Sequence, residues 1–164
     1  MSQARTWSLV QALAGRWTGL GQGRFPTITS FAYREELVFR AHGRAALLHM
    51  EQITWLVQDG ITDAYPQHWE SGFLQVTEDG GLMLSNAQNH GRVEVLTGSA
   101  ALEGDQLVLT LRDAVLANDA RMRASTRVFR LAGNTLTYEM GMATDRVAAL
   151  TAHLSASLTR ADEA

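Results

Sequence analysis

The chain has 164 residues, of which 46% are hydrophobic, and carries a formal net charge of −3. This length predicts one domain over residues 1–164, the acidic balance disfavours nucleic acid as a partner, and the lack of cysteine excludes disulfides, thiolate metal sites and cysteine nucleophiles. Because the chain has neither a signal-like start nor a stretch of about 18 apolar residues, we expect a cytoplasmic protein that makes no membrane contact.

A short helix is predicted near the N-terminus, over residues 5–13. Trp7 and Val10 lie at helical spacing there, and Thr6 or Ser8 can cap the helix. Such a helix leads directly into the first strand and would close one end of a barrel.

The next strand has an unusual glycine pattern. One face of it carries Trp17, followed by three positions without a side chain, Gly19, Gly21 and Gly23. Repeated glycine in a strand indicates a tight bend or the close approach of a flat group to bare backbone. On spacing alone we favour a sharply coiled barrel strand with Trp17 at the floor of the barrel.

Further strands follow at near-regular spacing. Residues 30–40 alternate apolar and charged side chains, with Glu35 as the one polar residue on the apolar side. The other predicted strands span residues 45–58, 68–77, 82–88, 92–102, 106–112, 120–131 and 135–142. Together they predict an all-β fold, a single antiparallel up-and-down β-barrel of about ten strands with a short N-terminal helix.

The C-terminal segment is ambiguous by period. Residues 149–158 fit a helix and a strand equally well, because Leu150, Leu154 and Leu158 satisfy both spacings. A closed barrel needs a last strand that pairs with the first, so we predict a strand. Residues 160–164 are expected to fray.

Charged side chains offer candidate sites. No two of the five histidines have the spacing of a metal site on a single element. Glu70 and Glu94 are expected to be buried carboxylates paired with an arginine, rather than the acid and base of a glycosidase. Arg121, Arg123 and Arg127 share one parity of a strand, which is typical of a solvated outer face.

The string from Gly15 to Ile28 reads G-R-W-T-G-L-G-Q-G-R-F-P-T-I. It resembles the signature of the nitrobindin family, G-x-W-x-G-x-G-x-G-x-Y-P-T-I, with Phe25 in place of tyrosine. Members of that family are haem-binding barrels related in shape to lipocalins and fatty-acid-binding proteins.

Three later segments strengthen this resemblance. Residues 68–73 are similar to the family's His-x-Glu-x-Gly-Phe, and residues 87–95 to its Ala-Gln-x-x-Gly-x-x-Glu-Val. The segment from Met142 to His153 resembles the family's ending, in which the histidine is the axial ligand of haem iron. The resemblance therefore implies that His153 binds iron.

The resemblance implies one ferric haem b per chain, coordinated by His153 and lying across the glycine strand. It implies binding of nitric oxide and isomerisation of peroxynitrite to nitrate, and it leaves a homodimer open. One of the three arginines named above would then meet a haem propionate, and the role of His68 toward the iron stays open. The other positions expected at the cofactor are Thr27, Trp17, Gly19, Gly21, Gly23, His68, Gln88 and Met142.

The alternative function is that of a lipocalin-like carrier of a fatty acid or another small hydrophobic ligand, without iron. Gly15 and Trp17 fit such carriers as well, and an interior arginine could bind a fatty carboxylate. His68, His153 and the full glycine string favour haem.

Overall fold

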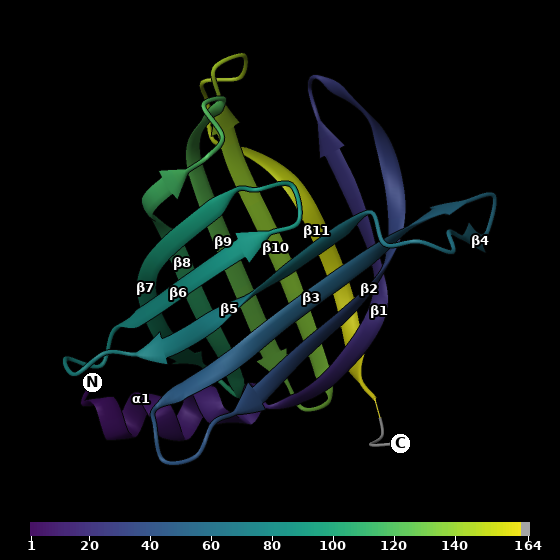
Figure 1. Cartoon of the computed structure of the whole chain (residues 1–164). Helices are drawn as coiled ribbons and strands as arrows, with labels where there is room; N and C mark the ends of the chain where they lie inside the picture. The colour runs from purple at the N-terminus through teal and green to yellow at the C-terminus, as the bar shows by residue number, and fades with distance from the viewer. Residues whose placement is uncertain (162–164) are drawn as a thin grey trace.

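The computed structural model describes residues 1–161 and shows a β-barrel with a short helix at one end (Figure 1). The helix α1 spans Gln3–Val10 and continues into a 3-10 turn, η1, over Gln11–Leu13. The predicted helix is confirmed, but it begins before both predicted caps, Thr6 and Ser8. Thr6 is instead fully buried inside the helix, so its hydroxyl cannot serve as the cap.

Within residues 1–161, eleven strands follow the helix. They are β1 (Gly15–Phe25), β2 (Ile28–Ala41), β3 (Leu47–Gln58), β4 (Ile61–Thr62), β5 (His68–Val76), β6 (Leu82–Gln88), β7 (Val93–Glu103), β8 (Gln106–Ala117), β9 (Met122–Ala132), β10 (Thr135–Thr144) and β11 (Thr151–Arg160). Their order in the sheet is β2-β1-β11-β10-β9-β8-β7-β6-β5-β3-β4, and the additional pairing of β2 with β3 closes the barrel. The two-residue β4 is an extra strand, so the predicted all-β, up-and-down barrel of about ten strands is confirmed, including a final strand that pairs with the first.

The end of the barrel next to α1 is its floor. Trp17 is fully buried and its Nε1 donates to the carbonyl of Leu13 at 2.8 Å, as expected for a floor residue. Arg160 lies over the Trp17 ring at 4.1 Å and donates to the carbonyls of Ala12 and Ala14 at 2.9 and 2.6 Å. Arg160 therefore belongs to β11, contrary to the prediction that the chain frays from this residue, and residues 162–164 lie outside the described part of the chain.

The glycine face of β1 is covered by aromatic rings. The register of β1 and β2 pairs Gly21 with Tyr33 and Gly23 with Phe31. A Cβ added at either glycine would collide with the ring of its partner. The expectation of bare backbone is therefore wrong, because the missing side chains make room for two rings of the protein itself.

The end of the barrel away from α1 is open. The β1–β2 hairpin and the turn between β10 and β11 project at this end (Figure 1). The pairing of β1 with β11 stops at Gly23 and Leu154, so the two strands separate there. This separation forms a seam in the wall, and it positions the site described below.

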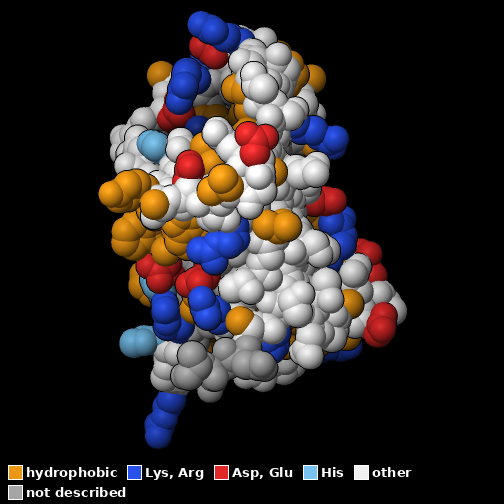
Figure 2. All heavy atoms as spheres, turned by 90° about the vertical axis from the view of Figure 1, so that its right-hand side faces the viewer, with side chains coloured by type: hydrophobic (Ala, Val, Ile, Leu, Met, Phe, Trp, Pro, Cys, Tyr) orange, Lys and Arg blue, Asp and Glu red, His pale blue; other side chains and the backbone are white. Residues whose placement is uncertain are grey.

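The outer surface is mixed in character. Ile61, Tyr65 and Trp69 are exposed on β4, the following loop and the start of β5. Figure 2 shows hydrophobic side chains gathered on part of one face, with charged side chains spread over the rest. Among residues 1–161, no helix has the length and apolar character needed to cross a membrane.

Candidate functional site

His153 lies at a bulge in β11. In the pairing with β10, Leu154 is opposite Met140 and Ala152 is opposite Gly141, so His153 is the extra residue. An extra residue interrupts the strict alternation of side chains along a strand and re-aims the side chain that it carries. The bulge therefore lets His153 turn toward the opening although its neighbour Leu154 also faces inward.

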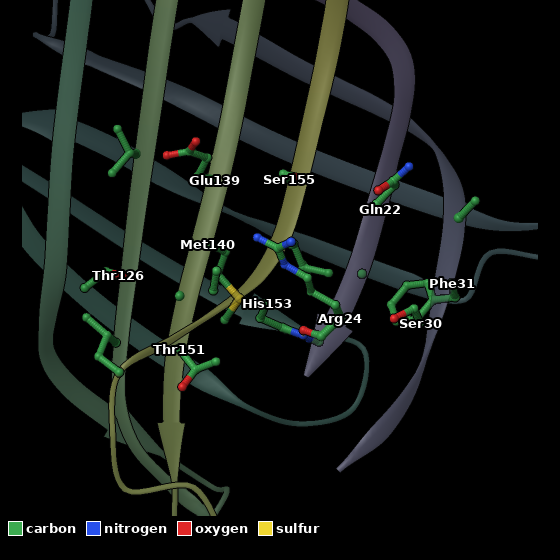
Figure 3. Close-up of a pocket in the computed structure, with 17 residues that line it drawn as sticks. Gln22, Arg24, Ser30, Phe31, Thr126, Glu139, Met140, Thr151, His153 and Ser155 are labelled. Atoms are coloured by element: carbon green, nitrogen blue, oxygen red, sulfur yellow. The ribbon is translucent and has the colours of Figure 1, made fainter. Parts of the chain in front are cut away.

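Arg24 is likewise left without a pairing partner, on β1. The register of β1 and β2 shifts between Gly23 and Phe25, and the pairing of β1 with β11 has already ended. The Arg24 carbonyl oxygen lies 3.0 Å from Nδ1 of His153, and the Phe25 ring stands edge-on to the imidazole with 5.6 Å between centroids. Figure 3 shows His153 and Arg24 together between β11 and β1, with Met140 beside them.

The hydrogen bond to Arg24 sets the protonation of the ring. A carbonyl oxygen only accepts, so Nδ1 of His153 carries the proton and Nε2 keeps its lone pair. Burial lowers the pKa of His153, opposed by the bond to Arg24 and assisted by the nearby charges of Arg92 and His68. The ring is therefore neutral at pH 7, with one nitrogen fixed and the other free, which is the form that binds haem iron.

His153 borders three cavities, of which an outer and an inner one carry most of the predicted site residues. The outer cavity has a volume of about 640 Å³, within the usual range of small-molecule sites. Its apolar walls come from Phe25, Phe31, Met122 and Met142. A flat apolar group next to Nε2 of His153 would be held here by dispersion contacts and shielded from water.

The inner cavity is smaller and polar, with a volume of about 300 Å³. Arg92, Asp119, Arg121 and His153 line both cavities, so the two spaces adjoin each other. The other polar side chains of the inner cavity are those of Gln52, His68, Glu70, Gln88, His90, Asn118, Arg127 and Tyr138.

A buried ion cluster forms one wall of the inner cavity. Arg127, 1% exposed, donates to both carboxylate oxygens of Glu70 and, through Nη2, to Oε2 of Glu94 at 2.9 Å. His68 Nε2 lies 3.3 Å from Oε2 of Glu70. Burial alone would raise the pKa of Glu70, but the charge and hydrogen bonds of Arg127 lower it to about 2. The prediction that Glu70 and Glu94 are buried and paired with an arginine is confirmed.

The expected outer row of arginines does not form. Arg121 and Arg123 are exposed, whereas Arg127 points into the barrel. The cause is a second bulge: Ala143 pairs with Ala124 and the next pair already involves Met122, so Arg123 is the extra residue on β9. Residues on either side of a bulge no longer share a parity.

An ion triad lies where the two cavities join. Asp119 accepts from Arg92 Nη2 at 2.9 Å and from Arg121 Nε and Nη2 at 2.9 and 3.0 Å. These hydrogen bonds, those of Arg121 first, lower the pKa of Asp119. The Arg121 side chain is 75% exposed and that of Arg92 only 17%, so the triad spans the distance from solvent to the interior.

The structure brings five of the predicted site residues to the two cavities. His153 lines both, His68 and Gln88 line the inner one, and Thr27 and Met142 line the outer one. His68 and Gln88 lie close together because Gln88 on β6 pairs with Glu70 on β5, and Glu70 is two residues after His68. Their roles at the cofactor stay predictions.

The remaining predicted residues lie elsewhere. Trp17 is at the floor, Gly19 backs onto the carbonyl of Ser157, and Gly21 is covered by the ring of Tyr33. Gly23 borders a third cavity of about 770 Å³, drawn in Figure 3, which also adjoins His153. The glycines therefore shape the wall around the site rather than the two adjoining cavities.

Sequence reasoning missed several polar residues of the inner cavity. Arg92, Asp119 and His90 were not singled out, although all three line it. The sequence signal for His90 and Arg92 was the turn between β6 and β7. Both residues lie in this turn, directly after β6, and β6 pairs with β5. A register for that hairpin would have placed both residues beside His68.

Comparisons with known proteins agree with this architecture. The family described as "THAP4-like, heme-binding beta-barrel domain" matches residues 7–160. A protein of Arabidopsis thaliana named as a peroxynitrite isomerase is 33% identical over 132 residues, covering 80% of this chain and 75% of its own. Peroxynitrite isomerase 2 of Mycobacterium marinum is 30% identical over 151 residues and 90% of each chain. The crystal structure of Rv2717c from M. tuberculosis superposes with a TM-score of 0.83 at 31% identity, covering 96% of this chain and 98% of that one.

Proposed function

Since this chain belongs to the THAP4-like, heme-binding β-barrel family, we propose that it binds one ferric haem b through His153 and isomerises peroxynitrite to nitrate. Nitric oxide is a second ligand of the same site. The observation that carries the proposal is the imidazole of His153, neutral, tied through Nδ1 to the Arg24 carbonyl and free at Nε2 beside an apolar cavity.

The residues present fit haem. The donor is a neutral imidazole, and the outer cavity combines apolar walls with Arg121 and Arg146 at its rim, suited to a macrocycle that carries two carboxylates. When bound, haem supplies an iron with an open coordination position, at which peroxynitrite can rearrange to nitrate.

The chain's own side chains do the rest. His153 supplies the lone pair of Nε2, and the Arg24 carbonyl keeps the ring from rotating. Phe25, Phe31 and Met142 exclude water from the outer cavity. His68, held by Glu70, lines the inner cavity.

The carrier alternative loses its main support. Its interior cation would be Arg127, but both oxygens of Glu70 and one of Glu94 already occupy this guanidinium. Only Nε of Arg127 has no partner among the described residues, and a fatty carboxylate bound there would bring a third carboxylate to one buried guanidinium. The interior therefore disfavours a fatty-acid anion.

The test is hemin titration of the purified protein and of His153→Ala. We expect a saturable one-to-one shift of the Soret band for the wild type, and an affinity at least about 100-fold lower for the variant, because the variant lacks the iron ligand. Stopped-flow decay of peroxynitrite should accelerate only with haem-loaded wild type. His42→Ala, which changes an exposed histidine, is the matched control. An unchanged Soret spectrum in His153→Ala would refute the assignment of the ligand.

A further inference from the structure

We propose that the inner cavity is a binding subsite for a small free oxyanion of the nitrate or nitrite class, with Arg92 as its anchor and His68 on the opposite side. The proposal rests on the proposed function, because peroxynitrite and nitrate are such anions. It assigns residues of this chain to their capture and can be tested without haem.

The acidic residues of the inner cavity are already engaged. Both oxygens of Glu70 are bound by Arg127, and Asp119 is shared by Arg92 and Arg121. A carboxylate that already accepts two charge-assisted hydrogen bonds repels an entering anion less than a free one. The acids therefore do not close the cavity to anions.

Arg92 keeps donor capacity that the fold does not use. Its Nη2 donates to Asp119 at 2.9 Å and its Nη1 lies 3.9 Å from Glu94, beyond hydrogen-bond distance. Its Nε is buried and has no partner among the described residues. A buried donor without a partner is costly, and a guanidinium presents pairs of N–H groups that match two oxygens of a planar oxyanion.

The other polar groups around this space include two histidine rings and an amide. His68 and His90 use Nε2 for Glu70 and for the carbonyl of Gln67, at 3.3 and 3.2 Å, and their rings lie 6.3 Å apart. Gln88 lines the same cavity and offers an amide N–H₂. A small planar anion would thus meet polar groups on several sides.

Size and position favour a free anion over a haem propionate. The inner cavity is less than half the volume of the outer one, about 300 against 640 Å³, and Arg92 is largely buried. The exposed Arg121 is the arginine of the triad better placed for a propionate at the rim. Arg92 also lines the inner cavity, where it can bind the smaller ligand.

The experiment is calorimetric titration of haem-free protein with sodium nitrate and sodium nitrite, with urea at equal concentration as a neutral planar control. We expect saturable one-to-one binding of both anions and none of urea. Arg92→Gln should weaken nitrate binding at least about tenfold, since it removes a charged donor. Arg92→Lys, which keeps the charge but not the fork, should give a smaller loss. Arg130→Gln, which removes a surface pair with Glu139 outside the inner cavity, should change the affinity less than about twofold.

Thermal melting of each variant shows whether it is folded. If Arg92→Gln does not fold, the Arg92→Lys protein still tests the proposal. Hemin titration separates the two sources of an oxyanion: Arg92→Gln should bind hemin and hemin dimethyl ester as the wild type does. A loss confined to hemin would assign Arg92 to a propionate and overturn the proposal. Equal nitrate binding by wild type and both Arg92 variants, or no nitrate binding at all, would overturn it too, whether or not haem-loaded protein isomerises peroxynitrite.

Discussion

Glu35 is a carboxylic acid held inside the barrel. It is fully buried, Gln52 Nε2 donates to its Oε1 at 2.6 Å, and its Oε2 has no partner among residues 1–161. Burial raises the pKa of Glu35 to about 8, although the bond from Gln52 opposes the shift. Glu35 is therefore mostly protonated in the folded protein at pH 7, while in the unfolded chain it is ionised.

This difference predicts a pH-dependent stability. Between the ordinary pKa of 4.5 and the folded value of about 8, the folded state holds a proton that the unfolded state has released. The free energy of unfolding should therefore fall as pH rises through this window, by at most about 1.4 kcal/mol per pH unit from this residue. Glu35→Gln cannot ionise and should flatten that slope, measured by urea unfolding across the window. Glu36→Gln, on the outer face, should keep it, and an equally steep slope in Glu35→Gln would contradict the assignment.

Single residues were predictable where alternation was unbroken. Glu35 shares its parity with the apolar residues of β2, and this placed it inside correctly. Glu70 and Glu94 were correctly expected to be buried and paired with an arginine. Arg127 was misplaced, because the extra residue at Arg123 reverses the parity of β9 and nothing in the composition marks a bulge.

At the scale of an element, the bulge in β11 is what aims His153, the proposed iron ligand. Deleting Ala152 removes the extra residue, so that His153 pairs with Gly141 and turns to the outer face of the sheet. We expect the circular dichroism of a strand-rich fold to remain, and the hemin affinity to fall at least about 100-fold as in the variant without the ligand. Ala152→Ser keeps the residue count and should bind hemin normally. Wild-type hemin affinity in the deletion variant would show that the bulge does not orient His153.

The strands themselves were largely predictable, because alternation and turn residues mark them. Their registers were not. Gly21 and Gly23 suggested bare backbone because the sequence does not reveal that Tyr33 and Phe31 lie directly opposite on β2. The cover on these glycines is a property of cross-strand pairing, which only the folded sheet determines. For the same reason the inner cavity, built from β3, β5, β6, β9, β10, β11 and the turns after β6 and β8, could not be assembled from the sequence.

On the scale of the whole molecule, the barrel has a closed end, which contributes to stability, and an open end, which holds the candidate site. The floor joins the N-terminal segment to the last strand through Trp17 and Arg160, and His153, the cavities and the ion triad lie toward the opposite end. The closure of β1 against β11 was predictable, because a barrel needs it. The difference between the two ends depends on long-range contacts and was not predictable. Substitutions at the floor should therefore change stability, and substitutions at the opening should change binding.

Arg160→Met tests this separation. Methionine keeps part of the packing over Trp17 but loses the cation and the hydrogen bonds to the carbonyls of Ala12 and Ala14. We expect the free energy of unfolding to fall by about 1–3 kcal/mol and the Tm of the haem-free protein by roughly 2–4 °C per kcal/mol. Arg130→Met, which removes only a surface pair with Glu139, should change the Tm little. Hemin affinity should stay at the wild-type value in both variants, since neither residue lines the two adjoining cavities. If Arg160→Met weakens hemin binding while the barrel remains folded, the floor and the open end of the barrel are coupled, and the proposed separation is wrong.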